Sequence, residues 1–380
     1  MTATRRAGLN PRSDPLAPWL HIDVLLVLGT LALAGLGIAM VYSSTRGIDP
    51  EAYETAFMQR QLMFVMVGAA LMAGAAIVPY DRLQAWAPVW YGAGIVGLVG
   101  VLVFGVTRNG AKSWFELGGF QVQPSEFLKV GYIVLLASFV SRHDGDLNLR
   151  QLVVALAIGG LPLALIMRQP DVGTALVFVA ITMGMLLIGG ARFRHIVALT
   201  LLGLGAAAVI WNSGLLEDYQ ADRLSSFIDP ASSQSEAAYQ QTQAQIAIGS
   251  GGVTGQGWGQ GGQTRGEFVP EQHTDFIFTV VGEELGFVGS ALVLVLFAVV
   301  VWRTWRTAKK AADLFGALIC VGVMTMLVFQ MFQSVGMTVG IMPITGIPAP
   351  FLSYGGSSAI TSFVAVGLVL NVHMRRYQVR

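Results

Sequence analysis

Charged residues are scarce in this chain of 380 residues, and cysteine is almost absent. Asp, Glu, Lys and Arg together make up 12% of the residues, about half the share of an average soluble domain, whereas 54% are hydrophobic. The net charge of +1 provides no basic surface for nucleic acid. The single cysteine, Cys320, excludes an intrachain disulfide and a cysteine-based metal cluster. These shortages, with a mean hydropathy of +0.63, indicate an all-α, polytopic membrane protein in contact with membrane lipids.

Apolar stretches long enough to cross a bilayer recur along the whole chain. We predict ten transmembrane helices in a single membrane domain that covers residues 22–372. The first stretch is long for the apolar region of a signal peptide and has no small-residue cleavage pattern after it, so we interpret it as a retained span. The expected spans are approximately residues 22–42, 62–78, 89–106, 125–140, 152–167, 174–190, 196–211, 276–301, 314–333 and 357–372.

The distribution of basic residues predicts the orientation of these spans. With the N-terminus placed inside, 15 of the 23 Lys and Arg residues fall in cytoplasmic segments, as the positive-inside rule requires. This orientation gives cytoplasmic tails at residues 1–21 and 373–380. It also gives a long extracytoplasmic loop at residues 212–274, between the seventh and eighth helices.

Two segments on the outer side depart from the pattern of simple spans. In the acidic long loop, residues 237–248 favour a short surface helix, and eight of the fourteen residues from Gly249 to Gly262 are glycine. That run favours a flexible loop with positive-φ turns, with a phosphate cradle as the alternative, although no GK[ST] motif follows it. The last outer connection, residues 336–358, is apolar but interrupted by three prolines. We interpret it as a re-entrant or capping segment beside the functional site.

Asp275 lies where a polar, aromatic segment turns into the eighth span, within the stretch FVPEQHTDFIFTVVGEELG from Phe268 to Gly286. If the helix is continuous, Glu283 and Glu284 lie about two turns further in. Carboxylates at that depth are costly in hydrocarbon, so each must face protein, water or a partner. For the two glutamates, a role in helix packing and a role in substrate contact are equally compatible with the sequence.

Glu126 and Lys129 in QPSEFLK lie three residues apart on one face of the fourth span. Such a pair either fixes helix packing by mutual neutralisation or lines a cavity that contacts substrate, and we favour the second interpretation. Arg168 and Asp171 in RQPD are further candidates for substrate contact. Aspartate before Val-Gly-Thr is also a favourable helix N-cap, which gives Asp171 a structural alternative.

Cations on the outer side are candidates for binding a diphosphate. Arg60, Arg108 and Lys112 each suit contact with solvent or lipid headgroups, but together they can neutralise a diphosphate. His273 is a further candidate for substrate contact beside Asp275. With Glu271, these two residues have the alternating spacing of a metal triad, although one or two carboxylates often suffice for magnesium or manganese. We assign no metal site; no organic cofactor is expected, and a divalent cation (magnesium or manganese) is compatible with the sequence.

Several longer motifs resemble a known family. They are GAKSWFELGGFQVQPSEFLK, RQPDVGTAL, FIDP, QIAIGSGG, FVPEQHTDFIFTVVGEELGFVGS and GIMPITGIPAPFLSYGGSS, spread from the third expected span to the tenth. In these motifs the chain resembles the shape, elongation, division and sporulation (SEDS) family, and its elongation-type members more than its division-type members. It departs from the family pattern at Ala349, where leucine is common, and at Val335, where asparagine is frequent.

The resemblance implies a fold and an activity. It implies ten spans in the bacterial plasma (inner) membrane and polymerisation of the lipid-linked precursor lipid II into glycan outside the membrane. The growing glycan is carried on undecaprenyl diphosphate, and a class B penicillin-binding protein is the implied partner, acting as the transpeptidase. The family's catalytic aspartate falls on Asp275, and its cavity glutamate and lysine fall on Glu126 and Lys129.

Other functions remain compatible with these residues. A transporter or flippase for the same lipid would also need intramembrane charges and a central cavity. A division-type polymerase or a membrane scaffold for wall synthesis are the further alternatives. A flippase needs no base at the membrane surface, so the function of Asp275 separates it from a polymerase.

Overall fold

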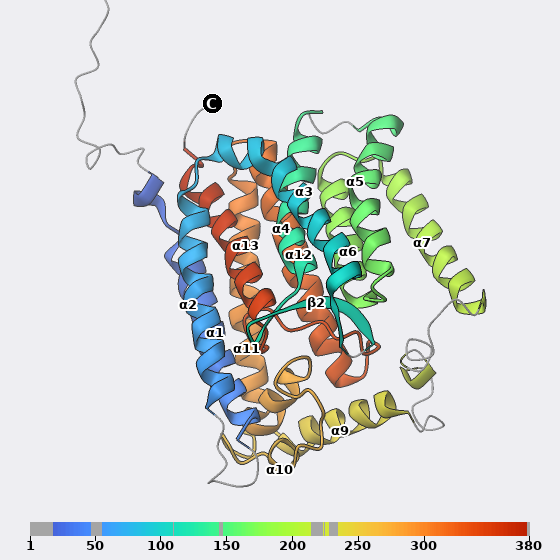
Figure 1. Cartoon of the computed structure of the whole chain (residues 1–380). Coiled ribbons are helices and arrows are strands. Elements are labelled where there is room, and N and C mark those ends of the chain that lie inside the picture. The colour runs from blue at the N-terminus through green and yellow to red at the C-terminus, as the bar shows by residue number, and fades with distance from the viewer. Residues whose placement is uncertain are drawn as a thin grey trace, which may run out of the picture.

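The computed structural model describes residues 18–46, 55–108, 110–143, 147–213, 223, 225–227 and 235–377, and helices dominate it (Figure 1). The predicted amino-terminal tail lies outside these residues except for 18–21, as do parts of the predicted loop at 212–274 and residues 378–380. The long helices are α1 (Val24–Ser44), α2 (Ala56–Ile77), α3 (Tyr80–Phe104), α4 (Pro124–Ser141), α5 (Leu149–Met167), α6 (Val172–Ile188), α7 (Phe193–Ser213), α11 (Ile277–Lys309), α12 (Leu314–Val339) and α13 (Gly356–Met374). The shorter elements are η1 (Pro18–His21), α9 (Glu236–Gly251), α10 (Gly262–Arg265) and three β-strands.

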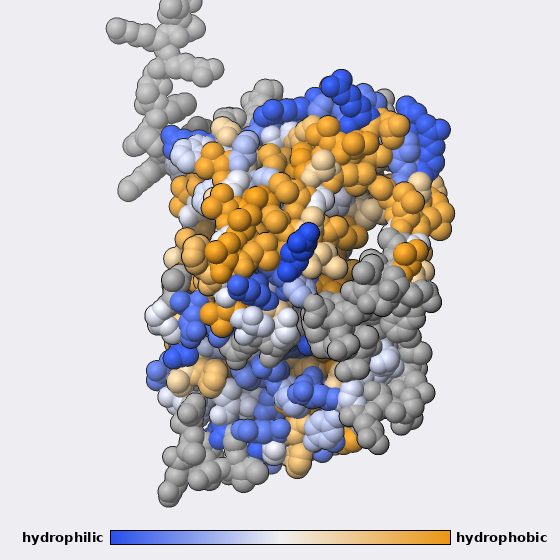
Figure 2. Space-filling model, turned by 45° about the vertical axis from the view of Figure 1, so that its right-hand side comes forward, coloured by the Kyte–Doolittle hydropathy of each residue, from blue (hydrophilic) through white to orange (hydrophobic). Residues whose placement is uncertain are grey.

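Each expected span falls on one of the long helices. Within the described residues, eight helices are long and apolar enough to cross a membrane. Two shorter apolar helices, Val172–Ile188 and Phe193–Gly205, cover the sixth and seventh expected spans. The predicted class, a helical polytopic membrane protein, is therefore confirmed, and the count of ten crossings stays a prediction. Figure 2 shows hydrophobic side chains gathered in a broad band, with a hydrophilic rim above and a more hydrophilic region below.

The centre of the bundle is formed by α4, α12 and α13, with α1 and α2 on one side and α5, α6 and α7 on the other (Figure 1). Tyr132 on α4, Phe178 on α6 and Phe363 on α13 are fully buried in the core. The helix α9 lies across one end of the bundle. It covers residues 236–251, so the surface helix expected at 237–248 is present.

A small sheet connects α3 to α4, and the sequence analysis did not foresee it. Strands β1 (Val106–Arg108), β2 (Ala111–Leu117) and β3 (Phe120–Val122) are antiparallel in that order. Gly118 and Gly119 make the turn between β2 and β3 with φ of +56° and +84°. Positive φ at both turn residues is the requirement of a tight hairpin. The sheet ends one residue before the N-cap of α4, so it fixes where that helix begins.

The eighth expected span is not one continuous helix, so the depth inferred for Glu283 and Glu284 on that condition does not apply. Gly286 has non-helical φ and ψ of 65° and −162°, which breaks α11 after its first nine residues. Residues 287–309, at about 1.5 Å per residue, are about 34 Å long and cross a bilayer without the first segment. Glu283 and Glu284 precede the break and are buried, with Glu283 bonded to the loop at Gln263.

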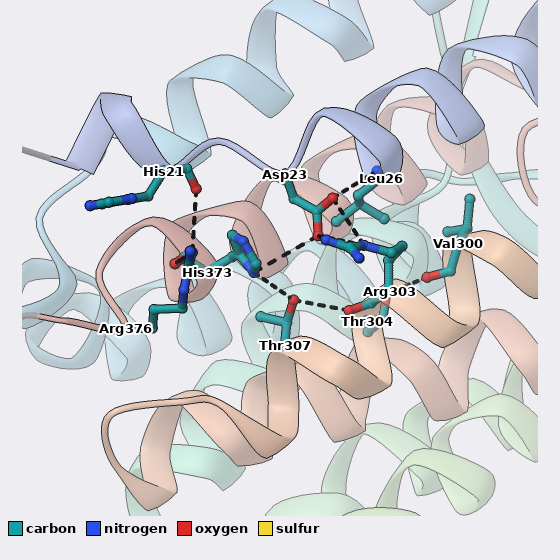
Figure 3. A network of polar contacts seen from close by, with 9 residues as sticks. All are labelled: His21, Asp23, Leu26, Val300, Arg303, Thr304, Thr307, His373 and Arg376. Carbon is teal, nitrogen blue, oxygen red and sulfur yellow. Dashed lines mark hydrogen bonds and ion pairs between the residues drawn. The ribbon is translucent and has the colours of Figure 1, made fainter.

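At the opposite end from α9, a polar network joins α1, α11 and α13 (Figure 3). Asp23, the N-cap of α1, pairs with Arg303 of α11, whose Nη2 lies 2.7 Å from Oδ2 of Asp23. Thr307 of α11 bonds His373 of α13 at 3.1 Å. Because Asp23 is 2% exposed, loss of Arg303 would leave an uncompensated buried charge. The network therefore fixes the relative position of three helix ends.

The predicted orientation can be tested by cysteine labelling. Thr254 and Lys310 are exposed at opposite ends of the chain's eighth span, whereas the native Cys320 is buried and should remain unlabelled. Thr254→Cys should react with a membrane-impermeant maleimide in intact cells, and Lys310→Cys only after permeabilisation. The reverse pattern, or labelling of both in intact cells, would contradict the orientation.

Candidate functional site

A buried ion pair lies in the first turns of α4. Pro124 opens the helix at a position where its missing N–H is harmless. Lys129 donates from Nζ to Oε1 of Glu126 at 2.7 Å. The two residues are only 1% and 3% exposed. Charges buried so completely must compensate each other, because their surroundings cannot solvate them.

Asp171 joins the start of α6 to the start of α4. Its carboxylate caps α6 by accepting the backbone N–H of Thr174 at 2.9 Å and the Thr174 hydroxyl at 2.8 Å. Gln123, just before α4, donates its side-chain amide to the same carboxylate at 3.0 Å. Burial raises the pKa of Asp171; Thr174 lowers it, Glu126 raises it and Lys129 lowers it. Glu126, Lys129 and Asp171 therefore form one electrostatically coupled group, here called the buried charge cluster.

Asp275 lies in the turn before α11 and faces the connection between α12 and α13. A Cβ on Gly346 would lie 3.2 Å from Oδ2 of Asp275, and Gly346 has φ of +69°. The preceding carbonyl, of Thr345, packs so closely on Gly173 that a side chain there would overlap it. Ser334 of α12 donates its hydroxyl to the backbone carbonyl of Asp275 at 3.5 Å. The backbone at Thr345 and Gly346 thus contacts both Asp275 and the first turn of α6.

The charge state of Asp275 depends on its surroundings. Burial raises the pKa of Asp275 to about 7; Glu271 also raises it, Arg223 lowers it and Asp171 raises it. The contribution of Asp171 links Asp275 electrostatically to the buried charge cluster. A carboxyl group with this pKa exchanges a proton near neutral pH, which suits general acid–base chemistry.

The residues from Gly340 to Gly355, here called the strap, hold this geometry. Gln333 of α12 donates to the carbonyl of Pro343 at 2.9 Å, and Gln61 of α2 donates to the carbonyl of Ser353 at 3.1 Å. The strap is non-helical, and its segment from Ala349 to Ser353 is buried. Its polar backbone is thus bonded to neighbouring helices, as burial requires.

His273 lies next to Asp275 in sequence, but its ring packs among aromatic side chains. The ring centroids of Phe57 and Tyr354 lie 5.1 Å and 5.7 Å from that of His273. The backbone N–H of Tyr354 donates to the carbonyl of His273 at 2.9 Å, which joins the strap to this segment. The proposed contact of His273 with substrate stays a prediction.

Two of the predicted cations, Arg60 and Arg168, are exposed, and a third, Lys112, bonds to backbone carbonyls. Lys112 donates from Nζ to the carbonyls of Leu102 and Val103, at 2.9 Å and 3.2 Å, and so caps the end of α3. Arg60 lies on α2 and Arg168 at the end of α5. Within the described residues, neither arginine hydrogen-bonds to the buried charge cluster. The assignment of Arg60 to a diphosphate and of Arg168 to substrate contact stays a prediction, and the structure gives Lys112 a structural role as well.

A metal triad of Glu271, His273 and Asp275 has little support in the geometry. Among the described residues, no group of three or more His, Cys, Asp or Glu side chains has positions that could hold a metal ion. The ring of His273 packs with aromatic rings. Asp171, a further carboxylate that acts on Asp275, already accepts hydrogen bonds at both of its oxygens. A divalent cation therefore stays a prediction, with the carboxylates of Asp275 and Glu271 as its candidate ligands.

The two glutamates of α11 organise the glycine-rich loop. Glu283 accepts the backbone N–H groups of Gln263 and Thr264 at 2.7 Å and 2.9 Å, at the start of α10. Glu284 accepts the hydroxyl of Ser43 from α1 at 2.7 Å. Backbone N–H groups of the loop also bond to Glu284. The structural role is thus the one observed, and a phosphate cradle is disfavoured because these loop amides already bind carboxylates.

Comparison with known proteins identifies the family. Residues 24–378 match the family model of the FtsW, RodA and SpoVE cell cycle proteins. The chain belongs to this family.

Relatives in this family cover nearly the whole chain. Stage V sporulation protein E of Bacillus subtilis (strain 168) is 39% identical over 92% of this chain and 96% of its own. Peptidoglycan glycosyltransferase MrdB of Escherichia coli (strain K12) is 34% identical over 97% of both chains. A crystal structure of the rod shape determining protein RodA of Thermus thermophilus has a TM-score of 0.71, with 30% identity over 95% of this chain and 99% of that one.

A second solved structure carries further information on the family. It concerns the structural coordination of polymerization and crosslinking by a peptidoglycan synthase complex. Its matching chain has a TM-score of 0.80 and 31% identity, covering 95% of this chain and all of that one.

Sequence reasoning missed several residues that shape the candidate site. Gly346 and Arg223 act on Asp275 across long sequence separations, which no local motif reveals. The sequence did offer a signal for Gln123. This residue directly precedes the Pro-Ser-Glu start of α4 and is placed to reach a neighbouring helix cap.

The contributions of Glu126 and Lys129 to the stability of the protein should be strongly coupled. Glu126→Gln or Lys129→Met alone would leave one buried charge without its partner and should each destabilise the purified protein by about 3–5 kcal/mol. The double variant should lose less than the sum of the two single losses, as measured by thermal unfolding in detergent. Additive losses in this double-mutant cycle would contradict the pairing.

Proposed function

We propose that this protein is a peptidoglycan polymerase of the elongation machinery. It transfers the growing glycan from undecaprenyl diphosphate onto lipid II at the outer face of the membrane, with Asp275 as general base. The observation that carries the proposal is a partly buried carboxyl group with a pKa of about 7, held between the strap and the buried charge cluster. Relatives named peptidoglycan glycosyltransferase, matched over nearly the full chain, support the same activity.

The reaction requires a single proton acceptor. A hydroxyl oxygen of the lipid II sugar attacks the anomeric carbon of the donor glycan, forming the glycosidic bond. The bond from that carbon to the diphosphate oxygen breaks, and undecaprenyl diphosphate leaves with the bonding electrons. Asp275 takes the hydroxyl proton, while diphosphate is a good leaving group once its charge is neutralised, so no general acid is needed. Such neutralisation is the role proposed for the outer cations Arg60, Arg108 and Lys112.

The elongation role and the partner rest on the relatives. Proteins named MrdB and RodA match this chain over almost all of both lengths. Division-type relatives named FtsW match at 34–36% identity, so the preference for elongation follows from motif resemblance. The implied partner is a class B penicillin-binding protein, which would cross-link the strands. The similarity to a chain of a peptidoglycan synthase complex supports this assignment.

Asp275→Asn should abolish polymerisation while preserving the fold. Asparagine is nearly isosteric but cannot accept the proton, so glycan synthesis from labelled lipid II should fall by at least about 10²–10⁴-fold. Thermal stability and membrane level serve as controls. A variant that still makes long glycan near the wild-type rate would refute the base and favour a transporter or scaffold.

The same assignment fixes the pH dependence of the wild type. Because the pKa of Asp275 is raised to about 7, the reactive carboxylate is populated above that pH and lost below it. The rate should therefore fall about tenfold for each pH unit below 6. A rate that is independent of pH between 5 and 7 would contradict a general base with this pKa.

Gly346→Ala should reduce catalysis by displacing the base. A Cβ at Gly346 would lie 3.2 Å from Oδ2 of Asp275 and displace it by a few tenths of an ångström. Since a shift of about 1 Å can cost on the order of 10²-fold in rate, the loss here should be smaller, about 3–10-fold. Gly119→Ala is the matched control, because Gly119 has a similar φ of +84° with nothing within 4 Å. Both variants should lose about 1–2 kcal/mol of stability to backbone strain, and only Gly346→Ala should lose activity. Equal activity in the two variants would contradict the positioning role of the strap.

A further inference from the structure

A cation–aromatic cluster lies near the end of α1, on the same side of the protein as the glycine-rich loop. The guanidinium of Arg46 lies 4.9 Å from the ring centroid of Tyr42 and 5.7 Å from that of Trp258. The two rings are 5.9 Å apart and inclined by 38°. Trp258 is nevertheless 47% exposed, so much of its ring is open to a ligand.

The loop that carries Trp258 is held firmly in place. Gly255, Gly257 and Gly259 all have positive φ, so the backbone follows a path that other residues would strain. Glu284 accepts N–H groups from this loop and the hydroxyl of Ser43, which lies on α1 between Tyr42 and Arg46. A buried carboxylate thus fixes Trp258 and Arg46 relative to each other.

The neighbours of Trp258 favour a polar ligand over lipid tails. Gln256 and Gln260 flank it in sequence and are exposed. Val253, earlier in the same loop, is exposed and apolar, but the amides of Gln256 and Gln260, the guanidinium of Arg46 and the open aromatic face together suit a saccharide. Sugar C–H groups stack on the ring, and hydroxyl and N-acetyl groups hydrogen-bond to the polar side chains.

The cluster is connected to the segment of Asp275. Gln272, three residues before Asp275, is 5% exposed and donates to the carbonyls of Ser44 and Thr264 at 2.8 Å and 2.9 Å. Three residues of chain span at most about 11 Å, so Ser44 lies within about 20 Å of Asp275. One glycan chain is long enough to contact both places.

We propose that Tyr42, Arg46 and Trp258 form a saccharide subsite that holds the glycan chain during polymerisation. The ligand class is a β-linked chain of N-acetylated amino sugars. The subsite rests on the proposed polymerase function, and it would keep the chain bound between successive additions. It acts by binding and takes no part in the bond-forming step.

The test compares Trp258→Ala with Tyr239→Ala. Tyr239 on α9 is equally exposed, at 47%, and belongs to no such cluster among the described residues. Trp258→Ala should shorten the glycan made from lipid II by about 3–10-fold and leave the initial rate at saturating lipid II within about twofold, because stacking contributes binding and not chemistry. Tyr239→Ala should leave both quantities unchanged.

A direct binding measurement separates the subsite from the polymerase activity. Chitotetraose, a soluble β-1,4-linked tetramer of N-acetylglucosamine, should give saturation-transfer NMR signals with the wild type and with Asp275→Asn, and lose them with Trp258→Ala. If the wild type makes no glycan but still binds the tetramer through Trp258, the proposed polymerase function fails, and the saccharide site remains without its role in polymerisation. If glycan is made but neither its length nor tetramer binding depends on Trp258, the subsite fails alone.

Two conservative variants distinguish stacking from lipid anchoring or loss of folding. Trp258→Phe keeps a flat ring and should retain most of the product length, whereas Trp258→Leu keeps apolar volume only and should behave like Trp258→Ala. Full activity of the leucine variant would overturn the proposal in favour of a lipid anchor. A length defect that arises only with an added penicillin-binding protein, without loss of tetramer binding, would overturn it in favour of a protein interface.

Discussion

The need to compensate charges within an apolar helix bundle governs the rest of this structure. An ionised side chain removed from water costs several kcal/mol unless a partner and hydrogen bonds replace its hydration. Lys129 and Glu126 meet that need with each other, Asp23 meets it with Arg303, and Glu283 meets it with backbone amides. The pairs of Asp23 and of Glu283 join segments that are distant in sequence, whereas Glu126 and Lys129 pair within the first turns of α4. The charged residues therefore determine how the helices are assembled as well as what the site can do.

Asp275 differs from these groups because its compensation is incomplete. Burial and two neighbouring carboxylates raise its pKa to about 7, and the opposing effect of Arg223 is weaker. The strap presents backbone at Gly346, where a side chain would crowd the carboxylate. The free-energy cost of burying Asp275 without full compensation is offset by its surroundings, namely the hydrogen-bonded strap and the cap of α6. A proton acceptor near neutral pH is the chemical result.

How much of this was predictable varies between elements. Hydropathy located all ten long helices, because each must present about 20 apolar residues to lipid or core. The motif resemblance singled out Asp275, Glu126 and Lys129, and the RQPD stretch added Asp171; the structure couples these four residues electrostatically. The sheet at 106–122 was missed, since its strands are short and their pairing is stabilised by a two-glycine turn. The break at Gly286 was missed because φ is set by contact with the loop at Gly255, far away in sequence.

The sequence by itself determined the membrane class, the approximate spans and the identity of the candidate base, since these follow from composition, local periodicity and motifs. Only the tertiary structure decided which charged residues belong together. Lys112 caps α3 and His273 packs among aromatic rings, although both are residue types that often bind ligands. Glu283 and Glu284 anchor a loop, and Gly346 lies against Asp275 across 71 positions of sequence. The physical reason is that a side chain's charge and role depend on burial and partners, and these arise from contacts between segments that no local pattern records.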